Sequence, residues 1–435
     1  MSLSTQPYKG VRDFYPEDMR VQNYIYGIWS KVCEQFGYEQ YSASVLESAE
    51  IYEAKSGQEI VDNEMYTLTD KGDRRVALRP EMTPTVSRMV AGRRQELAYP
   101  VRWYSIPNLL RYERPQRGRL REHWQLNVDI FGVQGTAADH EIISVADAIM
   151  QAFGAKRSMY EIRVNSRQFI NYVLHDYLGL DTVEGHTISK LIDRMHKMER
   201  GEFIALTEAA INPTARDAGV ADKLLQLLDS GSMEALPEEL QAVPSLQGIR
   251  ELMALLEKSG ILNARFDLSL MRGFDYYTDT VFEVFDLAPE NNRAMFGGGR
   301  YDGLVGLFGV EPVPTVGFGQ GDVTMRLFLE THNLLPEQPT ETELYVVLIG
   351  DTYTGVQPLL QELRHEGVKC AVDISGRKID KQIQTAEKKG ILYALFIGEK
   401  ELEEQRYPVK NLKTGEEQLL SSARLVSFVK DIRRK

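Results

Sequence analysis

Apolar residues recur along the chain with two different periods, and each period predicts one kind of element. Residues 17–36 carry apolar side chains at helical spacing, with Pro16 at the start and Gly37 where a left-handed C-cap would fall, so we predict a helix there. A second helical stretch runs over 81–96. Short alternating runs, bounded by turn residues, predict antiparallel strands. They occupy 65–69, 101–106 and 124–132.

The period changes again in the middle of the chain. Residues 175–262 are helical in period and contain few β-branched runs, whereas strand-like sequence resumes at 265–285. This order predicts an all-helical insertion between two parts of one core.

A polar segment at 331–342 contains two prolines and predicts a linker. Beyond it, three apolar runs alternate with helical patterns at 352–366 and 378–389, as in the βαβ units of a small, mostly parallel domain. The fold class predicted for the whole chain is α+β. Its parts are a core at 1–174 and 263–330, a helical insertion at 175–262, the linker at 331–342 and a C-terminal α/β domain at 343–435.

Length and composition narrow the class of protein. A chain of 435 residues is longer than a single hydrophobic core usually accommodates, so we expect two or three domains. A composition of 43% apolar and 26% charged residues is typical of a globular protein. No apolar run approaches the roughly 18 residues of a membrane span, and the first residues lack the basic and apolar regions of a secretion signal. Cys33 and Cys370 lie far apart, which indicates a reducing compartment. We therefore expect a cytoplasmic protein with no membrane partner.

Five arginines fall within eleven positions at 111–121, although the chain has a net charge of −12. Only Glu113 opposes them there. Arginine forks bind phosphates and carboxylates in bidentate fashion, so the stretch is a candidate anion site. A solvated loop is the alternative, and the stretch alone does not decide between them. The acidic balance of the chain argues against non-specific nucleic-acid binding, but it allows a specific nucleic-acid partner held by local basic patches.

Three further stretches carry residues suited to chemistry: RPEMT at 79–83, MRGFDYYTDTVFEV at 271–284 and MFGGGRYDGLVGLFG at 295–309. In a strand, Gln125 and Asp129 would point to the same face. The three consecutive glycines permit close approach of the backbone to a ligand. A capped junction, aromatic packing and a tight turn would explain the three stretches equally well. The sequence shows no metal-ligand spacing and no Walker-type phosphate loop.

In this order, the stretches resemble the class II aminoacyl-tRNA synthetases, and within that class the histidyl-tRNA synthetase family. RYERPQRGRLREHWQ at 111–125 is similar to the second class II motif, and RGFDYYTDTVFE at 272–283 is similar to a segment peculiar to the histidine enzymes. GGGRYDGL and the segment AVDISGRKIDKQIQTAEKKGILYALFIGE resemble the same family and its anticodon-binding domain. The resemblance implies a class II antiparallel-sheet catalytic core with a helical insertion, followed by a C-terminal α/β anticodon-binding domain.

The same resemblance implies an ATP-dependent aminoacyl-tRNA ligase that activates L-histidine to histidyl-adenylate and transfers it to the 3′ end of tRNA(His). It also implies ATP with Mg²⁺ as cofactor, no metal held by a protein ligand set, and a homodimer. Two relatives without the ligase activity are alternatives: the regulatory subunit of ATP phosphoribosyltransferase and a synthetase-like tRNA sensor fused to a kinase. The C-terminal domain argues against the first, and the lack of a kinase signature argues against the second.

Roles for individual residues follow from the resemblance. Catalysis would rest on Arg111 and Arg272, on two sides of the α-phosphate of ATP, and the loop arginines as a group would face ATP and the acceptor end of tRNA. The roles implied for the site as a whole are histidine binding by Glu81, Thr83, Gln125, Asp129, Tyr276 and Tyr277, ATP binding by Arg111, Glu113, Arg119 and His123, and contact with the tRNA acceptor end by Gln116 and Arg117.

Three positions depart from the family pattern. Ser44 replaces the proline of the first motif, His123 replaces the phenylalanine that stacks on adenine, and Thr324 replaces the arginine of the third motif. Arg326 lies two residues further on. In a helix this spacing turns a side chain by about 200° around the axis, so we expect Arg326 to point away from the adenine.

Overall fold

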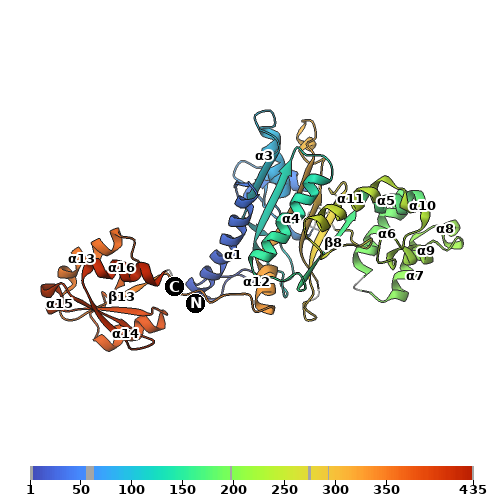
Figure 1. The fold of residues 1–435 in the computed structure, drawn as a ribbon. Coiled ribbons are helices and arrows are strands. Elements are labelled where there is room, and N and C mark those ends of the chain that lie inside the picture. Colours follow the sequence, from blue (N-terminus) through green and yellow to red (C-terminus); the bar gives the residue numbers. More distant parts are fainter. Residues whose placement is uncertain (1–2, 55–62, 196–197, 273–275, 292, 434–435) are drawn as a thin grey trace. The chain divides into compact units, whose positions relative to one another are not determined.

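The structure is a computed structural model that describes residues 3–54, 63–195, 198–272, 276–291 and 293–433. The chain forms two compact units, each with its own sheet (Figure 1). The first comprises Met1–Asp13 and Gln22–Leu335, and the second comprises Phe14–Val21 and Pro336–Lys435. Within the second unit, Arg20 Nε donates to the carbonyl of Gln338 at 3.1 Å, which helps to explain why Phe14–Val21 groups with the C-terminal residues.

The first unit is built on a mixed sheet with strand order β1-β5-β7-β12-β11-β10-β8-β9, in which β6 also pairs with β7. The pairs from β5 across to β8 are antiparallel, as the alternating runs predict, whereas the edge strands β1 and β9 pair in parallel. The strands are β1 Glu39–Gln40, β5 Val101–Ser105, β6 Asn108–Leu110, β7 Glu122–Phe131, β8 Tyr160–Ser166, β9 Ala264–Phe266, β10 Thr280–Asp286, β11 Arg293–Arg300 and β12 Thr315–Gly321.

Helix α1 (Pro16–Gln35) confirms the first helical prediction. Its apolar stripe buries Ile25, Trp29 and Val32, at the i, i+4, i+7 spacing of one helix face. Two residues beyond its end, Gly37 adopts a φ of +80°, the left-handed conformation that favours glycine.

Helix α3 (Thr83–Gly92) is shorter than the predicted 81–96. Pro84 sets the first turn, so Glu81 stays in the segment before the helix. After Gly92 the backbone forms a separate turn, in which the Glu96 N–H donates to the carbonyl of Arg93 at 2.8 Å. The other elements around the large sheet are α2 Glu50–Glu53, α4 Thr136–Ala152, η4 Val305–Phe308, α12 Asp322–Thr331 and a small sheet of β2 Leu46–Ser48, β4 Arg75–Leu78 and β3 Tyr66–Thr69.

The middle of the chain is helical. Its elements are α5 Arg167–Tyr172, η2 Val173–Tyr177, α6 Thr182–Arg194, α7 Arg200–Ala210, α8 Pro213–Asp217, α9 Val220–Leu228, α10 Glu238–Gln241 and α11 Pro244–Lys258. Their apolar faces form a cluster of buried side chains that includes Phe169, Ile188, Phe203 and Leu224. Residues 196–197 of the predicted insertion lie outside the described residues.

The second unit contains a five-stranded sheet of order β14-β13-β15-β16-β17. The three predicted strands are present and parallel, but β16 and β17 add an antiparallel edge that the sequence did not indicate. β16 is only five residues long and contains a proline, Pro408, which is atypical of a strand inside a sheet, and β17 is largely exposed, so neither gives a clear pattern. The elements are β13 Leu344–Leu348, α13 Tyr353–His365, β14 Cys370–Val372, α14 Ile379–Lys388, β15 Tyr393–Ile397, α15 Glu399–Glu404, β16 Tyr407–Asn411, β17 Glu417–Leu420 and α16 Ser422–Ile432. Among the helices in the described ranges, none is long and apolar enough to cross a membrane.

Candidate active site

A cavity of about 810 Å³ lies in the first unit and is lined by parts of β7, β11 and β12. It brings together most of the residues that the sequence singled out. Those that line it are Glu81, Thr83, Arg111, Glu113, Arg119, His123, Gln125, Asp129, Arg272, Tyr276 and Tyr277. Gln116 and Arg117 do not line it. They are exposed at the tip of the arginine loop, where the backbones of Gln116 and Arg119 exchange hydrogen bonds of 3.0 and 2.9 Å.

Glycines of two neighbouring strands make room for four of these side chains. A Cβ at Gly297 or Gly299 of β11 would collide with Arg272 or the Tyr277 ring, and one at Gly317 or Gly319 of β12 would collide with Asp129 or Gln125. We call these four glycines the glycine floor. The close backbone approach predicted from the GGG run is therefore present, but its immediate partners are the side chains of the cavity.

Asp129 is 3% exposed on β7, and its two carboxylate oxygens differ. The Tyr301 hydroxyl donates to Oδ1. Oδ2 is buried and has no hydrogen-bond partner among the described residues. Burial raises the pKa of Asp129 from 3.8 to about 7, and the Tyr301 hydrogen bond opposes this shift. A ligand N–H would complete the hydrogen bonding of this carboxylate.

Next to Asp129, a second carboxylate and two tyrosines line the same cavity. The Tyr276 hydroxyl donates to Glu81 Oε2 at 3.2 Å, and the Tyr276 ring packs against those of Tyr277 and Tyr301, with centroids 4.9 and 5.7 Å apart. Gln125 Nε2 donates to Asn127 Oδ1 at 2.7 Å. Because Gln125 and Asp129 both line the cavity from β7, the predicted shared face of this strand is confirmed.

Arg272 reaches the cavity from a left-handed backbone conformation with a φ of +53°. For a residue with a side chain this conformation costs on the order of 1 kcal/mol and is typical of functional sites. Nη1 donates to the carbonyl of Phe282 at 3.2 Å and lies 3.6 Å from Glu283 Oε1. Burial raises the pKa of Glu283, and the charge of Arg272 acts against this shift. Residues 273–275 of the same motif lie outside the described residues.

In the arginine loop, Glu113 lies between two guanidinium groups. Its carboxylate is 3.8 Å from Arg111 Nη1 and 3.9 Å from Arg119 Nη1. Arg111 is anchored by a 2.9 Å hydrogen bond from Nε to the carbonyl of Pro80. Burial, followed by the charge of Arg111, lowers the pKa of His123 to about 3, so this imidazole is neutral at physiological pH.

Arg121 corrects the expectation that all the loop arginines face a polyanion. Its guanidinium lies 3.9 Å from the centroid of the Tyr112 ring and donates to the Tyr8 hydroxyl at 3.0 Å and to the carbonyl of Glu113 at 3.1 Å. Arg121 is 9% exposed and does not line the cavity. Its contacts fix the loop to the N-terminal segment, where its charge is used in cation–π packing. Arg114 is exposed and also lies away from the cavity lining.

Several cavity residues were not identified from the sequence. Tyr301 belongs to the RYDGL stretch, but its contact with Asp129 spans 172 positions. Helix α6 of the insertion presents a polar face whose spacing i, i+3, i+4, i+7, i+8 was a usable signal. Its lining members are His186, Ser189, Lys190, Asp193 and Arg194.

Thr324 and Arg326 both lie on α12. Thr324 lines the cavity, and its hydroxyl donates to the carbonyl of Met295 at 3.0 Å. Arg326 does not line it, and its Nε donates to Glu330 Oε1 at 2.8 Å. The helical geometry assumed for these two positions is therefore present.

Comparison with known proteins shows which family the chain resembles. Residues 10–320 match the family model described as histidyl-tRNA synthetase, and residues 343–432 match that of an anticodon-binding domain. A histidine–tRNA ligase of Leptospira biflexa is 41% identical over 433 residues, covering 99% of this chain and 98% of that protein.

Solved structures show the same fold. A histidyl-tRNA synthetase of S. aureus matches with a TM-score of 0.71 at 26% identity, covering 98% of this chain and 100% of that one. A histidyl-tRNA synthetase of a Nostoc species matches with a TM-score of 0.82 at 22% identity, covering 100% of both chains. On the family match over most of its length and the full-length similarity to the Leptospira protein, the chain belongs to the histidyl-tRNA synthetase family.

Proposed function

We infer that this protein is a histidine–tRNA ligase, which activates L-histidine with ATP and transfers the histidyl group to tRNA. The full-length similarity to proteins of that name supports this function, as does the anticodon-binding domain at 343–432. The regulatory-subunit alternative is not favoured, because that relative lacks the domain that this chain carries.

For histidine recognition, the observation that carries the proposal is Asp129 Oδ2, a buried acceptor without a partner among the described residues. An imidazole N–H of the substrate would occupy it, and the Tyr277 hydroxyl would bond the other ring nitrogen. Glu81, Thr83 and Gln125 would surround the α-ammonium group. A site whose buried polar groups need partners rejects substrates that lack the matching group far better than an apolar pocket does.

For ATP, Arg111 and Arg272 would act on the α-phosphate. An oxygen of the histidine carboxylate attacks the α-phosphorus, the bond to the β-phosphate oxygen breaks, and pyrophosphate leaves. The step needs no proton transfer, so positioning and charge stabilisation by the two guanidiniums would supply the catalysis.

The rest of the nucleotide would contact the arginine loop. Glu113 would accept from the adenine amino group, and the neutral His123 ring would stack on the base. Arg119, which is 60% exposed, would close on the phosphate tail. We propose that Mg²⁺ enters with ATP as part of the substrate complex and neutralises the same phosphates.

The tRNA acceptor end would reach Gln116 and Arg117, a proposal supported by their exposure at the loop tip. We also propose that the protein is a homodimer and acts in the cytoplasm. The cytoplasmic assignment is supported by the free state of both Cys33 and Cys370.

Histidine-dependent exchange of labelled pyrophosphate into ATP tests the ligase function directly. We expect exchange with L-histidine and with no other standard amino acid, and charging of tRNA(His) by the same preparation. Exchange that is absent at all Mg²⁺ and ATP concentrations would instead support the regulatory-subunit reading.

A further inference from the structure

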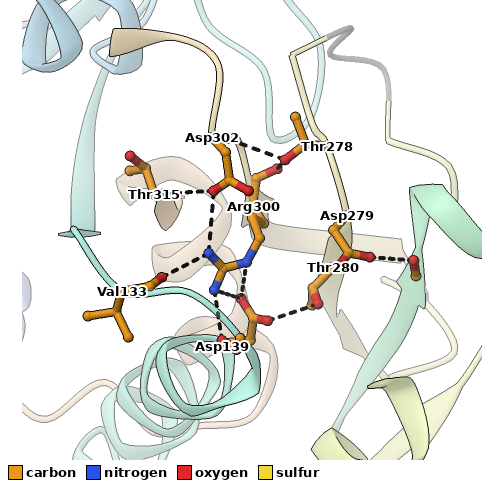
Figure 2. Close-up of polar contacts among 10 residues, drawn as sticks. Val133, Asp139, Thr278, Asp279, Thr280, Arg300, Asp302 and Thr315 are labelled. Atoms are coloured by element: carbon orange, nitrogen blue, oxygen red, sulfur yellow. Dashed lines mark hydrogen bonds and ion pairs between the residues drawn. The ribbon is translucent and has the colours of Figure 1, made fainter. Parts of the chain in front are cut away.

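A buried ion pair lies outside the cavity, at the N-terminal end of α4. Arg300 and Asp139 are 4% and 3% exposed, and neither lines the cavity. Nε and Nη2 of Arg300 donate to Asp139 Oδ1 at 3.1 and 2.8 Å (Figure 2). The guanidinium also donates to the carbonyls of Val133 and Gly135, both at 3.0 Å. One side chain thus joins the end of β11 to α4 and to the loop that follows β7.

The same pair is bonded to the starts of two further strands. The Thr280 hydroxyl, on β10, donates to Asp139 Oδ2 at 3.1 Å. Arg300 Nη1 donates to Asp302 Oδ1 at 3.3 Å, and this carboxylate oxygen accepts the Thr315 N–H of β12 at 2.8 Å (Figure 2). Within the described residues, both members of the pair are thus bonded to protein groups and lie apart from the cavity lining.

The cluster is connected to two cavity tyrosines, Tyr277 and Tyr301. Thr278 follows Tyr277, and its N–H donates to the carbonyl of Arg300 at 2.7 Å. Its hydroxyl donates to the same carbonyl and accepts from the Asp302 N–H, both at 3.3 Å. Tyr301 itself lies between Arg300 and Asp302, and its N–H donates to the carbonyl of Thr315 at 2.8 Å.

We propose that Arg300 and Asp139 are positioning residues for histidine recognition, and this inference rests on the proposed ligase function. The pair holds Arg300 and Asp302, on both sides of Tyr301, and the Arg300 carbonyl and Asp302 N–H in turn hold Thr278, directly after Tyr277. In this way it sets where the two phenols meet Asp129 and the substrate imidazole. A buried ion pair of this kind adds little to stability relative to apolar residues, but it favours one geometry. Among the described residues, no hydrogen bond or ion pair joins Arg300 or Asp139 to Arg111 or His123, so the nucleotide side of the cavity does not depend on the pair.

Arg300→Lys tests this, because lysine keeps the charge but cannot reproduce five directed N–H groups. In pyrophosphate exchange we expect the KM for histidine to rise about tenfold, the effect of roughly one lost hydrogen bond, with the KM for ATP changed by less than about twofold. Thr278 is exposed, and Thr278→Ala leaves the ion pair intact. This variant can replace Arg300→Lys as the test if Arg300→Lys does not fold. It should move the histidine KM in the same direction.

Arg102→Lys is the matched control. Arg102 pairs with Glu141 of the same helix α4 at 2.7 Å and lies outside the cavity lining, so both KM values should stay as in the wild type. Combining Arg300→Lys with Tyr301→Phe separates a positioning role of Arg300 from a purely structural one. If Arg300 acts through Tyr301, Arg300→Lys should add little to the histidine KM once Tyr301→Phe is present.

Equal rises in the KM for histidine and ATP, or fully additive effects of Arg300→Lys and Tyr301→Phe, would overturn the inference while leaving the ligase function in place. Absence of histidine-dependent exchange in the wild-type chain would overturn the ligase function, and the inference with it.

Discussion

The Tyr301 hydroxyl binds Oδ1 of the Asp129 carboxylate and leaves Oδ2 as the acceptor for a ligand in the cavity. A carboxylate held at one oxygen cannot rotate freely, so the direction of the second oxygen is set before the substrate arrives. Such preorganisation lowers the ordering cost of binding. If Asp129 binds the substrate imidazole as proposed, histidine recognition should be sensitive to small changes at Tyr301 and Asp129.

Replacing Asp129 with asparagine should weaken the use of histidine much more than the use of ATP. The change removes the charge that strengthens one hydrogen bond to the imidazole, and such a bond is worth about 1.5–3 kcal/mol. We expect kcat/KM for histidine to fall by roughly ten- to a hundredfold in pyrophosphate exchange. An unchanged value would remove Asp129 from the histidine pocket.

The affinity for histidine should depend on the protonation of Asp129. With a pKa of about 7, this group gains a proton as the pH falls below neutrality, so binding should weaken by up to about tenfold per pH unit. The substrate imidazole titrates as well, but equally in Asp129→Asn. Calorimetric titrations of both proteins at several pH values should therefore show a smaller slope in the variant, and parallel slopes would contradict the assignment.

The raised pKa of Asp129 also makes the stability of the folded chain depend on pH. Between pH 3.8 and about 7 the folded chain holds a proton that the unfolded chain releases. The contribution of Asp129 to the free energy of unfolding is therefore greatest below this range and falls as the pH rises through it. Asp129→Asn should unfold at a higher temperature than the wild type at pH 8 and lose this advantage at pH 4, as measured by thermal denaturation.

Arg272 and Arg326 should differ sharply when each is replaced with alanine. Arg272→Ala removes charge stabilisation at the reacting phosphate and should lower kcat/KM for exchange by at least about a hundredfold. Arg326→Ala should change kcat/KM for ATP by less than about tenfold, under about 1.4 kcal/mol, because Arg326 lies outside the cavity lining. Equal damage would mean that Arg326 has taken over the role lost at Thr324.

Gly297→Ala should disable the site although the change is one methyl group. The added Cβ would overlap the Arg272 guanidinium and the carbonyl of Phe282, and a misplacement of about 1 Å can cost about a hundredfold in rate. Gly303→Ala is the matched control, since nothing lies within 4 Å of its added Cβ. Comparable exchange rates for the two variants would show that β11 can shift without consequence.

A chain that ends at Leu335 should still exchange pyrophosphate but should charge tRNA poorly. The cavity lies within the first compact unit, whereas the residues matched to an anticodon-binding domain belong to the second. Steady-state aminoacylation of tRNA(His) by the full and shortened chains measures the difference. Equal charging would show that the last domain does not read tRNA.

Periodic features of the fold could be predicted from the sequence, whereas contacts between distant residues could not. The alternation in β7 placed Gln125 and Asp129 on one face, and both line the cavity. The charge density at 111–121 marked a candidate anion site, and the resemblance extended that role to the loop arginines as a group, but Arg121 stacks on Tyr112 and bonds Tyr8, which is 113 positions away. The residues around Arg121 in the sequence do not indicate so distant a partner.

The same limit applies to the strands and the insertion. Strand β16 and the edge strand β17 are only five and four residues long, and β17 is largely exposed, so neither gives an apolar pattern long enough to recognise. The period of α6 predicted a helix, but only the assembled cavity shows that its polar face meets residues of the large sheet. Family resemblance supplied the residue roles that pattern could not.

The glycine floor has a consequence for how this site can change in evolution. Every substitution of a glycine adds at least a Cβ, so no mutation at these four positions can make a small, graded adjustment. Each would displace Arg272, Tyr277, Asp129 or Gln125 outright. A change in substrate specificity during evolution is therefore expected at the other side chains that line the cavity. The four glycines should stay unchanged even in descendants that act on a different substrate.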